Sequence, residues 1–154
     1  MDIFTVSLFG HRDITDLRHL DTTMCLVIEE LIKTKSYVSF LIGRNGEFDE
    51  YTASVIKRIQ KKHGKENSEI RLILPYVVKD VEFYENYYDN ILIPECVAGL
   101  HPKSAIKKRN RWMIEQSDLV IAYLERENGG AYSAVKYAKR INKEVIYIKN
   151  RARF

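Results

Sequence analysis

The sequence predicts an α/β fold, a Rossmann-like three-layer sandwich in which helices cover both faces of a mostly parallel sheet. Short apolar segments alternate along the chain with longer segments in which apolar residues recur every three or four positions. This alternation is typical of parallel strands joined by helical crossovers, and right-handed crossovers place helices on both faces. Residues 119–124 (LVIAYL) are apolar without interruption, as expected of a strand covered on both sides.

The first half of the chain repeats a strand, loop and helix pattern. Residues 3–9 (IFTVSLF) are rich in β-branched and aromatic residues and end at Gly10, which indicates a strand. From residue 17 onwards, apolar side chains recur with helical periodicity, which predicts a helix packed on the sheet. Residues 37–42 (YVSFLI) repeat the strand pattern up to Gly43, and a second amphipathic helix follows.

The second half begins less regularly. Residues 70–74 are a short apolar strand that Pro75 ends, because proline removes a donor and fixes φ. Residues 81–89 fit either a short acidic helix or an ordered loop, and residues 90–93 fit a fourth strand. The remaining elements are a loop at residues 95–102, a basic helix at 103–116, a strand at 118–124, a helix at 131–141 and a strand at 144–149.

Length and composition indicate a single domain. The chain has 154 residues, of which 45% are hydrophobic, enough for one domain with a core over residues 1–150 and a tail at residues 151–154. The formal net charge is only +4, but it is unevenly distributed. Residues 103–111 hold five basic side chains, whereas residues 80–95 hold five acidic ones and no Lys or Arg. We therefore expect one basic surface beside the central turn.

Several classes of protein are excluded. Cys25 and Cys96 form neither a CxxC pair nor a disulfide-rich pattern, and no leader segment opens the chain, which fits a reducing cytoplasm. No apolar run approaches the roughly 18 residues needed to span a bilayer, so no membrane association is predicted. The four histidines lack metal-ligand spacing. We predict no metal ion and no cofactor.

Three loops that follow strands are expected to form one site. Residues 10–13, 43–49 and 128–131 each leave the carboxyl end of a predicted strand and enter a helix. In parallel sheets, ligands bind at the carboxyl ends of the strands, near the point where the strand order reverses. The three loops are therefore predicted to converge on one crevice.

The third loop is the first candidate for binding an anion. Gly129, Gly130 and Ala131 open a helix, where unpaired N–H groups and the helix dipole favour an anion by about 0.3 to 1 kcal/mol. The alternative is a tight turn from strand to helix. Because a strongly basic helix lies upstream, we favour anion binding at this loop over a purely structural turn.

That basic helix contributes Arg109 and Asn110. If Ile106 and Met113 pack inward, Arg109 and Asn110 lie on the same inward face and need a polar partner. A hydrogen bond from arginine to phosphate contributes about 1.5 to 3 kcal/mol, which is more than the dipole. The alternative for Arg109 is an internal salt bridge to a carboxylate such as Asp118 or Glu115.

The first two loops add further candidates. Arg12 is placed to contact a phosphate and His11 to bind a sugar or base after Gly10, although loops often carry such residues. Gly43 and Gly46 permit a tight turn. Asp49 is a candidate for a helix cap or a first-turn acid of the next helix, worth about 1 kcal/mol, or for binding a ribose hydroxyl. Neither GxGxxG nor GxxxxGK[ST] occurs, so the dinucleotide fingerprint and the Walker loop are excluded.

These motifs together resemble the SLOG superfamily of Rossmann-like proteins, and within it the YpsA-like branch. The motifs that carry the resemblance are Gly10-His11-Arg12, Gly43-x-x-Gly46-x-Phe48-Asp49, Arg109-Asn110-Arg111-Trp112-Met113 and Gly129-Gly130. The resemblance covers nearly the whole chain. It implies a SLOG domain that holds a nucleotide-related ligand over the strand ends and forms homo-oligomers.

Comparison with the LOG branch separates binding from catalysis. LOG relatives hydrolyse nucleoside monophosphates with a PGGxGTxxE motif and an upstream arginine, to which Arg109 corresponds. Here Asn128 replaces the proline, and Tyr132 and Ser133 replace the third glycine and the threonine. Lys136 occupies the position of the catalytic glutamate. The resemblance thus implies phosphate binding and no catalytic residue.

We therefore predict a sensor or regulatory protein that binds a nucleotide or an ADP-ribose-like, NAD-derived molecule. One alternative is a nucleoside monophosphate phosphoribohydrolase, an N-glycosidase of LOG type, with its carboxylate supplied by Asp49 or Glu47. A second is binding of single-stranded nucleic acid, as in the DprA branch. The modest net charge and the acidic middle segment disfavour nucleic acid.

Overall fold

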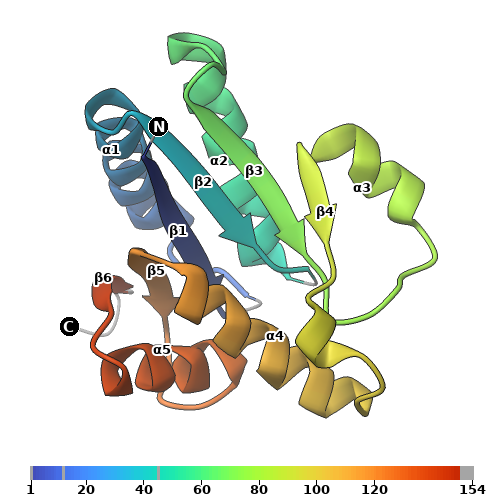
Figure 1. The fold of residues 1–154 in the computed structure, drawn as a ribbon. Helices are drawn as coiled ribbons and strands as arrows, with labels where there is room; N and C mark the ends of the chain where they lie inside the picture. Colours follow the sequence, from blue (N-terminus) through green and yellow to red (C-terminus); the bar gives the residue numbers. More distant parts are fainter. Residues whose placement is uncertain (1, 12, 45, 150–154) are drawn as a thin grey trace.

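The protein is built on one six-stranded sheet in which all strands are parallel (Figure 1). The structure is a computed structural model that describes residues 2–11, 13–44 and 46–149. The strands are β1 (Ile3–Gly10), β2 (Tyr37–Ile42), β3 (Ser68–Ile73), β4 (Asn90–Leu92), β5 (Leu119–Leu124) and β6 (Glu144–Lys149). The helices are α1 (Leu17–Thr34), α2 (Glu47–His63), α3 (Val81–Tyr87), α4 (Pro102–Gln116) and α5 (Gly130–Arg140), with a 3-10 turn, η1, at Glu95–Val97. The strand order is β4-β3-β2-β1-β5-β6.

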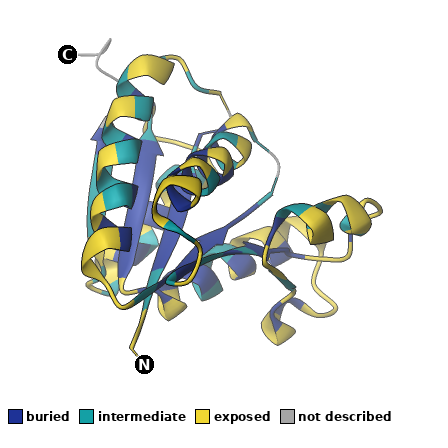
Figure 2. Ribbon diagram, turned by 90° about the horizontal axis from the view of Figure 1, so that it is seen from above, coloured by how far each residue is buried: buried dark blue, intermediate teal, exposed yellow. Residues whose placement is uncertain are grey.

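Helices cover both faces of this sheet. Figure 1 shows α1 and α2 on the far side and α4 and α5 on the near side. Alternate residues of each strand supply the two cores: in β5, Ile121 packs with α1 and α2, whereas Val120 packs with α4 and α5. Figure 2 shows the strands buried along most of their length and the helices exposed on their outer sides. The predicted Rossmann-like sandwich is confirmed, and the sheet is parallel throughout.

Local sequence explains where the longer helices begin. The Asp16 carboxylate accepts the His19 N–H at 3.4 Å and caps α1, whose inward stripe includes Leu20, Met24 and Ile28. Helix α4 begins with Pro102, which suits a first helical position because it lacks a free N–H. No helix within the described part of the chain is long and apolar enough to cross a membrane.

The structure settles the ambiguous segments and corrects one premise. Residues 81–87 form helix α3, and the loop at residues 95–102 contains η1 and the first residue of α4. Ile106 was expected to pack inward with Met113, but it is 36% exposed, whereas Met113 is fully buried. The inward stripe of α4 instead runs through Ala105, Arg109 and Met113, spaced four residues apart. Ile106 lies about 20° from Met113 around the helix axis, so periodicity alone does not separate them; Ile106 is exposed because it lines two cavities beside α4.

The order of the strands reverses between β1 and β5. From β1 the sheet grows outward through β2, β3 and β4, and on the other side through β5 and β6. The chain leaves β1 toward α1 on one face and leaves β5 toward α5 on the other. Because the two connections diverge, a crevice opens at the carboxyl ends of these strands.

Candidate functional site

A cavity of about 270 Å³ lies at this crevice. Its wall contains residues from all three predicted loops and from α4. The predicted site residues that line it are Gly10, His11, Gly43, Asp49, Arg109, Asn110, Gly130 and Ala131. Gly129 precedes the wall as the N-cap of α5, Gly46 lines an adjoining cavity, and Arg12 lies outside the described residues. We call this cavity the strand-end pocket.

Arg109 lines the pocket although its side chain is almost entirely buried. The residue is 7% exposed. Its Nη1 donates to the backbone carbonyl of Ile73 at 2.8 Å, and its Nε donates to Asn110 Oδ1 at 2.8 Å. Burial lowers the pKa of the Arg109 guanidinium, and the nearby charge of Asp49 opposes that shift. A guanidinium stays charged in proteins, so the pocket holds a partly desolvated cation.

Glycine makes room for this guanidinium. A Cβ atom on Gly43 would lie 3.1 Å from Arg109 Nη1 and 3.3 Å from its Cζ. The loop after β2 therefore passes directly over the arginine, a close approach that a side chain at this position would obstruct. Neither carboxylate considered from the sequence pairs with Arg109: Asp118 accepts the N–H of Thr5, and Glu115 accepts the hydroxyl of Tyr137.

The charge on Arg109 has an acidic neighbour in the pocket wall. Asp49 is half-buried in the first turn of α2, where Glu47 and Glu50 are also acidic. The N-cap of α2 is Gly46, so Asp49 is a first-turn acid and not the cap. Its oxygens interact favourably with the positive end of the helix dipole. Asp49 thus places a hydroxyl-accepting carboxylate in the same cavity as Arg109.

The first turn of α5 forms the facing wall. Gly129 caps the helix with φ 91°, a conformation that favours glycine. The Ser133 N–H bonds to the Gly129 carbonyl at 3.0 Å, so the preceding amides of α5 have no partner within the helix. Gly130 and Ala131 line the pocket. Nothing lies within 4 Å of a Cβ atom placed on Gly130, so this approach to the helix is open.

His11 joins the two loops that border the crevice. Its Nδ1 accepts the N–H of Glu125 at 2.8 Å, which leaves the proton on Nε2. The Nε2–H then donates to the Asn128 carbonyl at 3.0 Å. His11 is 3% exposed, and both ring nitrogens bind backbone groups of the loop after β5. Its role here is to hold that loop in place, while its ring forms part of the pocket wall.

Sequence reasoning missed Glu125, whose backbone N–H binds His11. We call the hydrogen bonds of His11 and Glu125 that join the loops after β1 and β5 the latch. The Glu125 carboxylate is 6% exposed and accepts both the N–H and the hydroxyl of Thr15, at 2.9 and 2.6 Å, and the hydroxyl of Tyr123. Burial raises the pKa of Glu125, but the hydrogen bonds from Thr15 and Tyr123 outweigh it, so the pKa lies below its ordinary value. The available signal was an acidic residue directly after an apolar strand.

Two further cavities adjoin the strand-end pocket. One shares Gly43, Arg44 and Asp49 with it and is otherwise acidic, through Glu47 and Glu50. The other lies between α4 and α5, has a volume of about 650 Å³ and contains Lys136. Lys136 therefore lines this second cavity and not the strand-end pocket.

The described residues contain no group of three or more His, Cys, Asp or Glu side chains placed to hold a metal ion. Three pocket residues with polar side chains, Arg44, Tyr76 and Arg126, were not among the predicted site residues. Tyr76 follows Pro75 at the end of β3 and is 37% exposed, so its ring borders the opening.

Comparison with solved structures identifies proteins of similar fold. No protein-family model and no curated protein matches the sequence. A molybdenum cofactor binding protein from Rippkaea orientalis superposes with a TM-score of 0.64 at 22% identity, over 99% of this chain and 80% of that one.

Two DNA processing proteins A are also similar. The protein from Helicobacter pylori, described for its mode of binding single-stranded DNA, gives a TM-score of 0.64 at 16% identity. DprA from Streptococcus pneumoniae gives 0.66 at 15%. Both matches cover 94% of this chain, which spans 64% and 50% of those proteins. At these identities the comparisons establish that this chain has the Rossmann-like fold of the three proteins.

Proposed function

We propose that this protein binds a nucleotide or an NAD-derived, ADP-ribose-like molecule in the strand-end pocket and serves as a sensor or regulatory module. The observation that carries the proposal is the buried Arg109 guanidinium in the pocket wall, opposite the open first turn of α5. A desolvated cation and free helix amides in one cavity are suited to an anion, and phosphate is an anion that both groups bind.

The relative strengths of the two groups assign their roles. A hydrogen bond between arginine and phosphate contributes about 1.5 to 3 kcal/mol, compared with about 0.3 to 1 kcal/mol for the helix terminus. Arg109 is therefore the main phosphate anchor, and the amides of Gly130 and Ala131 orient the group. Asn110, which already accepts the Arg109 Nε–H, keeps the guanidinium in place.

The remaining wall suits the nucleoside. Asp49 provides carboxylate oxygens for ribose hydroxyls, and Tyr76 provides an aromatic ring at the rim against which a base can stack. His11 acts indirectly, because both of its ring nitrogens bind backbone groups. The phosphate thus lies between α4 and α5, and the sugar lies toward α2.

The structural neighbours support a ligand-binding role in general, and their shared fold supports the proposed membership of the SLOG superfamily. One neighbour is a cofactor binding protein and another binds single-stranded DNA. The proposed YpsA-like branch and the homo-oligomeric state rest on the sequence motifs alone. Arg12 belongs to the proposal as a further phosphate contact from the loop after β1.

We propose that binding occurs without catalysis. The LOG-type glutamate position is Lys136, which lies in the cavity between α4 and α5 and is exposed. Of the two carboxylates named as its replacement, Glu47 accepts the N–H of Ile14, and the charge of Asp49 raises the pKa of Arg109 against the lowering effect of burial. Incubation with nucleoside monophosphates tests this part: released base, detected by chromatography, would establish the N-glycosidase alternative.

A thermal-shift panel of nucleotides tests the binding itself. We expect at least one nucleotide to raise the melting temperature, and Arg109→Ala to abolish that rise. The matched control is Arg18→Ala, which removes an exposed arginine on α1. Because Arg109→Ala leaves the Ile73 carbonyl without its donor, Arg109→Lys is measured alongside: it keeps a charge but not the planar fork. No stabilising nucleotide, or equal stabilisation of Arg109→Ala, would refute the assignment.

Single-stranded nucleic acid is the second candidate, because the cavity between α4 and α5 is strongly basic and continuous with the pocket. Binding of this kind would weaken steeply as salt is raised. A fluorescent oligonucleotide titrated at several salt concentrations distinguishes it from specific binding of a nucleotide.

A further inference from the structure

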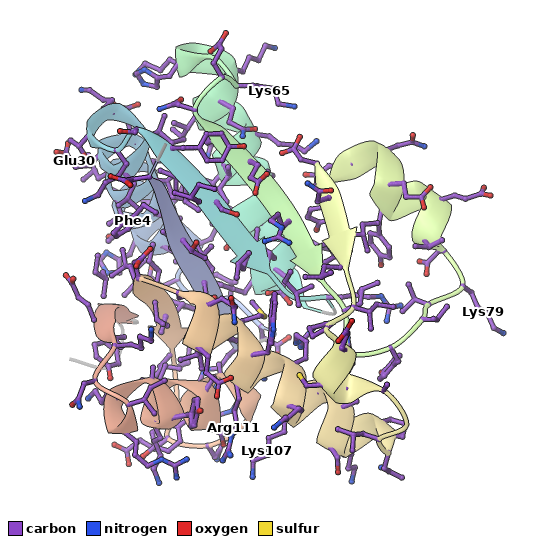
Figure 3. All side chains as sticks on the ribbon, in the orientation of Figure 1. Phe4, Glu30, Lys65, Lys79, Lys107 and Arg111 are labelled. Carbon is purple, nitrogen blue, oxygen red and sulfur yellow. The ribbon has the colours of Figure 1, made fainter. Side chains whose placement is uncertain are left out.

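The cavity between α4 and α5 is lined by cations from both helices. Its side chains include Lys103, Lys107 and Arg111 of α4 and Lys136 and Arg140 of α5, and no acidic residue. We call it the basic groove. Figure 3 labels Lys107 and Arg111 along the side of α4 that approaches α5. Within the described part of the chain, none of these five side chains forms an ion pair.

The spacing of the cations works against the helices that carry them. Lys103, Lys107 and Arg111 follow one another at intervals of four residues, and so do Lys136 and Arg140. Like charges four residues apart lie on the same face of a helix and destabilise it. The free protein therefore keeps a repulsive row of charges on each wall of the groove, an arrangement that a bound anion would neutralise.

Two of the arginines are held in position across the groove. The Arg111 guanidinium lies 4.7 Å from the centroid of the Tyr137 ring, and that of Arg140 lies 5.1 Å from the same ring. The Tyr137 hydroxyl is fixed in turn by Glu115. One anchored aromatic ring thus orients guanidinium groups from both helices, which lowers the entropic cost of binding an anion between them.

The basic groove continues the strand-end pocket. The two share Ile106, Asn110 and Gly130 in their walls. The cavity on the α2 side of the pocket has three acidic side chains, Glu47, Asp49 and Glu50, and one basic side chain, Arg44, so acidic groups predominate there. A phosphate chain that starts at Arg109 is therefore repelled on the α2 side and attracted along α4 and α5.

We propose that the ligand is a nucleoside polyphosphate whose phosphate chain runs from Arg109 into the basic groove, where Arg111 and Arg140 bind its outer phosphate. This inference rests on the proposed nucleotide site and deepens it, because it specifies the ligand class and the direction of the chain. The nucleoside lies toward Asp49, and the negatively charged phosphate chain extends toward Lys136.

The test compares each of the four ribonucleoside triphosphates with the matching monophosphate by calorimetric titration. In the wild type, we expect the preferred triphosphate to bind at least roughly tenfold more tightly than its monophosphate, since each outer phosphate gains charge-assisted hydrogen bonds. The double variant Arg111→Ala/Arg140→Ala should reduce that ratio to about one and leave the affinity for the monophosphate unchanged. Lys139→Ala is the matched control, because Lys139 lies over the Tyr147 ring and does not line the groove.

The outcomes separate this inference from the proposed function. Two results would overturn the proposal that the groove binds the outer phosphate: equal affinity of the wild type for both nucleotides, or an undiminished preference of the double variant for the triphosphate. Neither result would contradict nucleotide binding in the strand-end pocket. If no mono- or triphosphate binds, the groove proposal fails; the proposed function fails with it if ADP-ribose, titrated in the same way, does not bind either. A single-stranded oligonucleotide that binds more tightly than every mononucleotide, and loses its advantage in the double variant, would also overturn it, because the groove would then follow a nucleic-acid backbone.

Discussion

The two helix pairs that cover the sheet treat their charges in opposite ways. Between α1 and α2, cations and anions face one another: Arg58 Nη2 lies 2.7 Å from Asp21 Oδ1, and Lys62 Nζ lies 3.2 Å from Glu29 Oε2. Between α4 and α5, five cations line one groove without an ion pair among the described residues. Both pairs pack on the same sheet, so the fold itself does not require either arrangement.

This difference shows which of the two surfaces neutralises its own charge in the free protein. The α1–α2 surface neutralises its own charge and packs large side chains such as Phe48 and Ile56 beneath it. The α4–α5 surface packs the small Ala134 and Ala138 of α5 beside the larger Met113 and Ile114 of α4. Among the described residues, the five cations of its groove form no ion pair. We propose that the first surface is structural and that the second binds an anion. The predictions below test that contrast from the largest expected effect to the smallest.

The tight packing beneath α2 should make Gly10 intolerant of a side chain. A Cβ atom on Gly10 would lie 2.3 Å from the buried Phe48 ring, which stacks on Tyr123. We expect Gly10→Ala to lower the free energy of unfolding by about 1–3 kcal/mol, as over-packing does. Urea denaturation measures it. Gly130→Ala, at a position with open space, is the control and should change stability far less. Similar losses in both variants would contradict the difference in packing between the two positions.

Acid should loosen the latch between the loops after β1 and β5. The pKa of Glu125 is lower in the folded protein than its ordinary value of 4.5, so its contribution is complete above that pH and is lost as the pH falls through the folded pKa. We expect stability to decline on acidification below about pH 5, with a smaller decline in Glu125→Gln. Thermal melts from pH 7 to pH 3 measure it. Glu30→Gln, an exposed change on α1, should retain the wild-type slope.

The ion pair between Asp21 and Arg58 should contribute only modestly, because both side chains are at least 40% exposed. A double-mutant cycle with Asp21→Asn and Arg58→Gln should give a coupling energy of about 0.2–1 kcal/mol, decreasing with added salt. A coupling energy near zero would mean that Asp21 and Arg58 balance each other's charge without forming a stabilising ion pair.

Neutralising one cation of the basic groove should stabilise the free protein. Lys107 lies between two like charges, so Lys107→Gln should raise the free energy of unfolding by about 0.2–0.5 kcal/mol. The same substitution should weaken ligand binding. Parallel urea and ligand titrations measure both quantities. If stability falls instead, the row of cations is not under repulsion, and the argument from its spacing is wrong.

Most of the fold was accessible from sequence because it depends on local periodicity. The uninterrupted apolar run at β5 and the glycines after β1 and β2 were sufficient to predict a parallel sheet and converging loops. The inward position of Arg109 was predicted correctly from an incorrect premise, since Ile106 lies at the rim and the stripe passes through Ala105.

The contacts within the site were less accessible, because they join residues far apart in sequence and often involve backbone groups. The partners of His11 are an N–H and a carbonyl 114 and 117 residues away, and Arg109 bonds a carbonyl of β3. Backbone groups leave no trace in residue type. The five cations of the groove were visible in sequence, but only the packing of α4 on α5 shows that they face one another.

Mass spectrometry of material released from the denatured protein tests the central claim most directly. The account predicts that the wild type releases a phosphate-bearing nucleotide, that Arg109→Ala releases none, and that the Arg18→Ala control behaves like the wild type. Release of a compound without an anionic group, or equal release by wild type and Arg109→Ala, would contradict the claim that the strand-end pocket captures phosphate through its buried arginine.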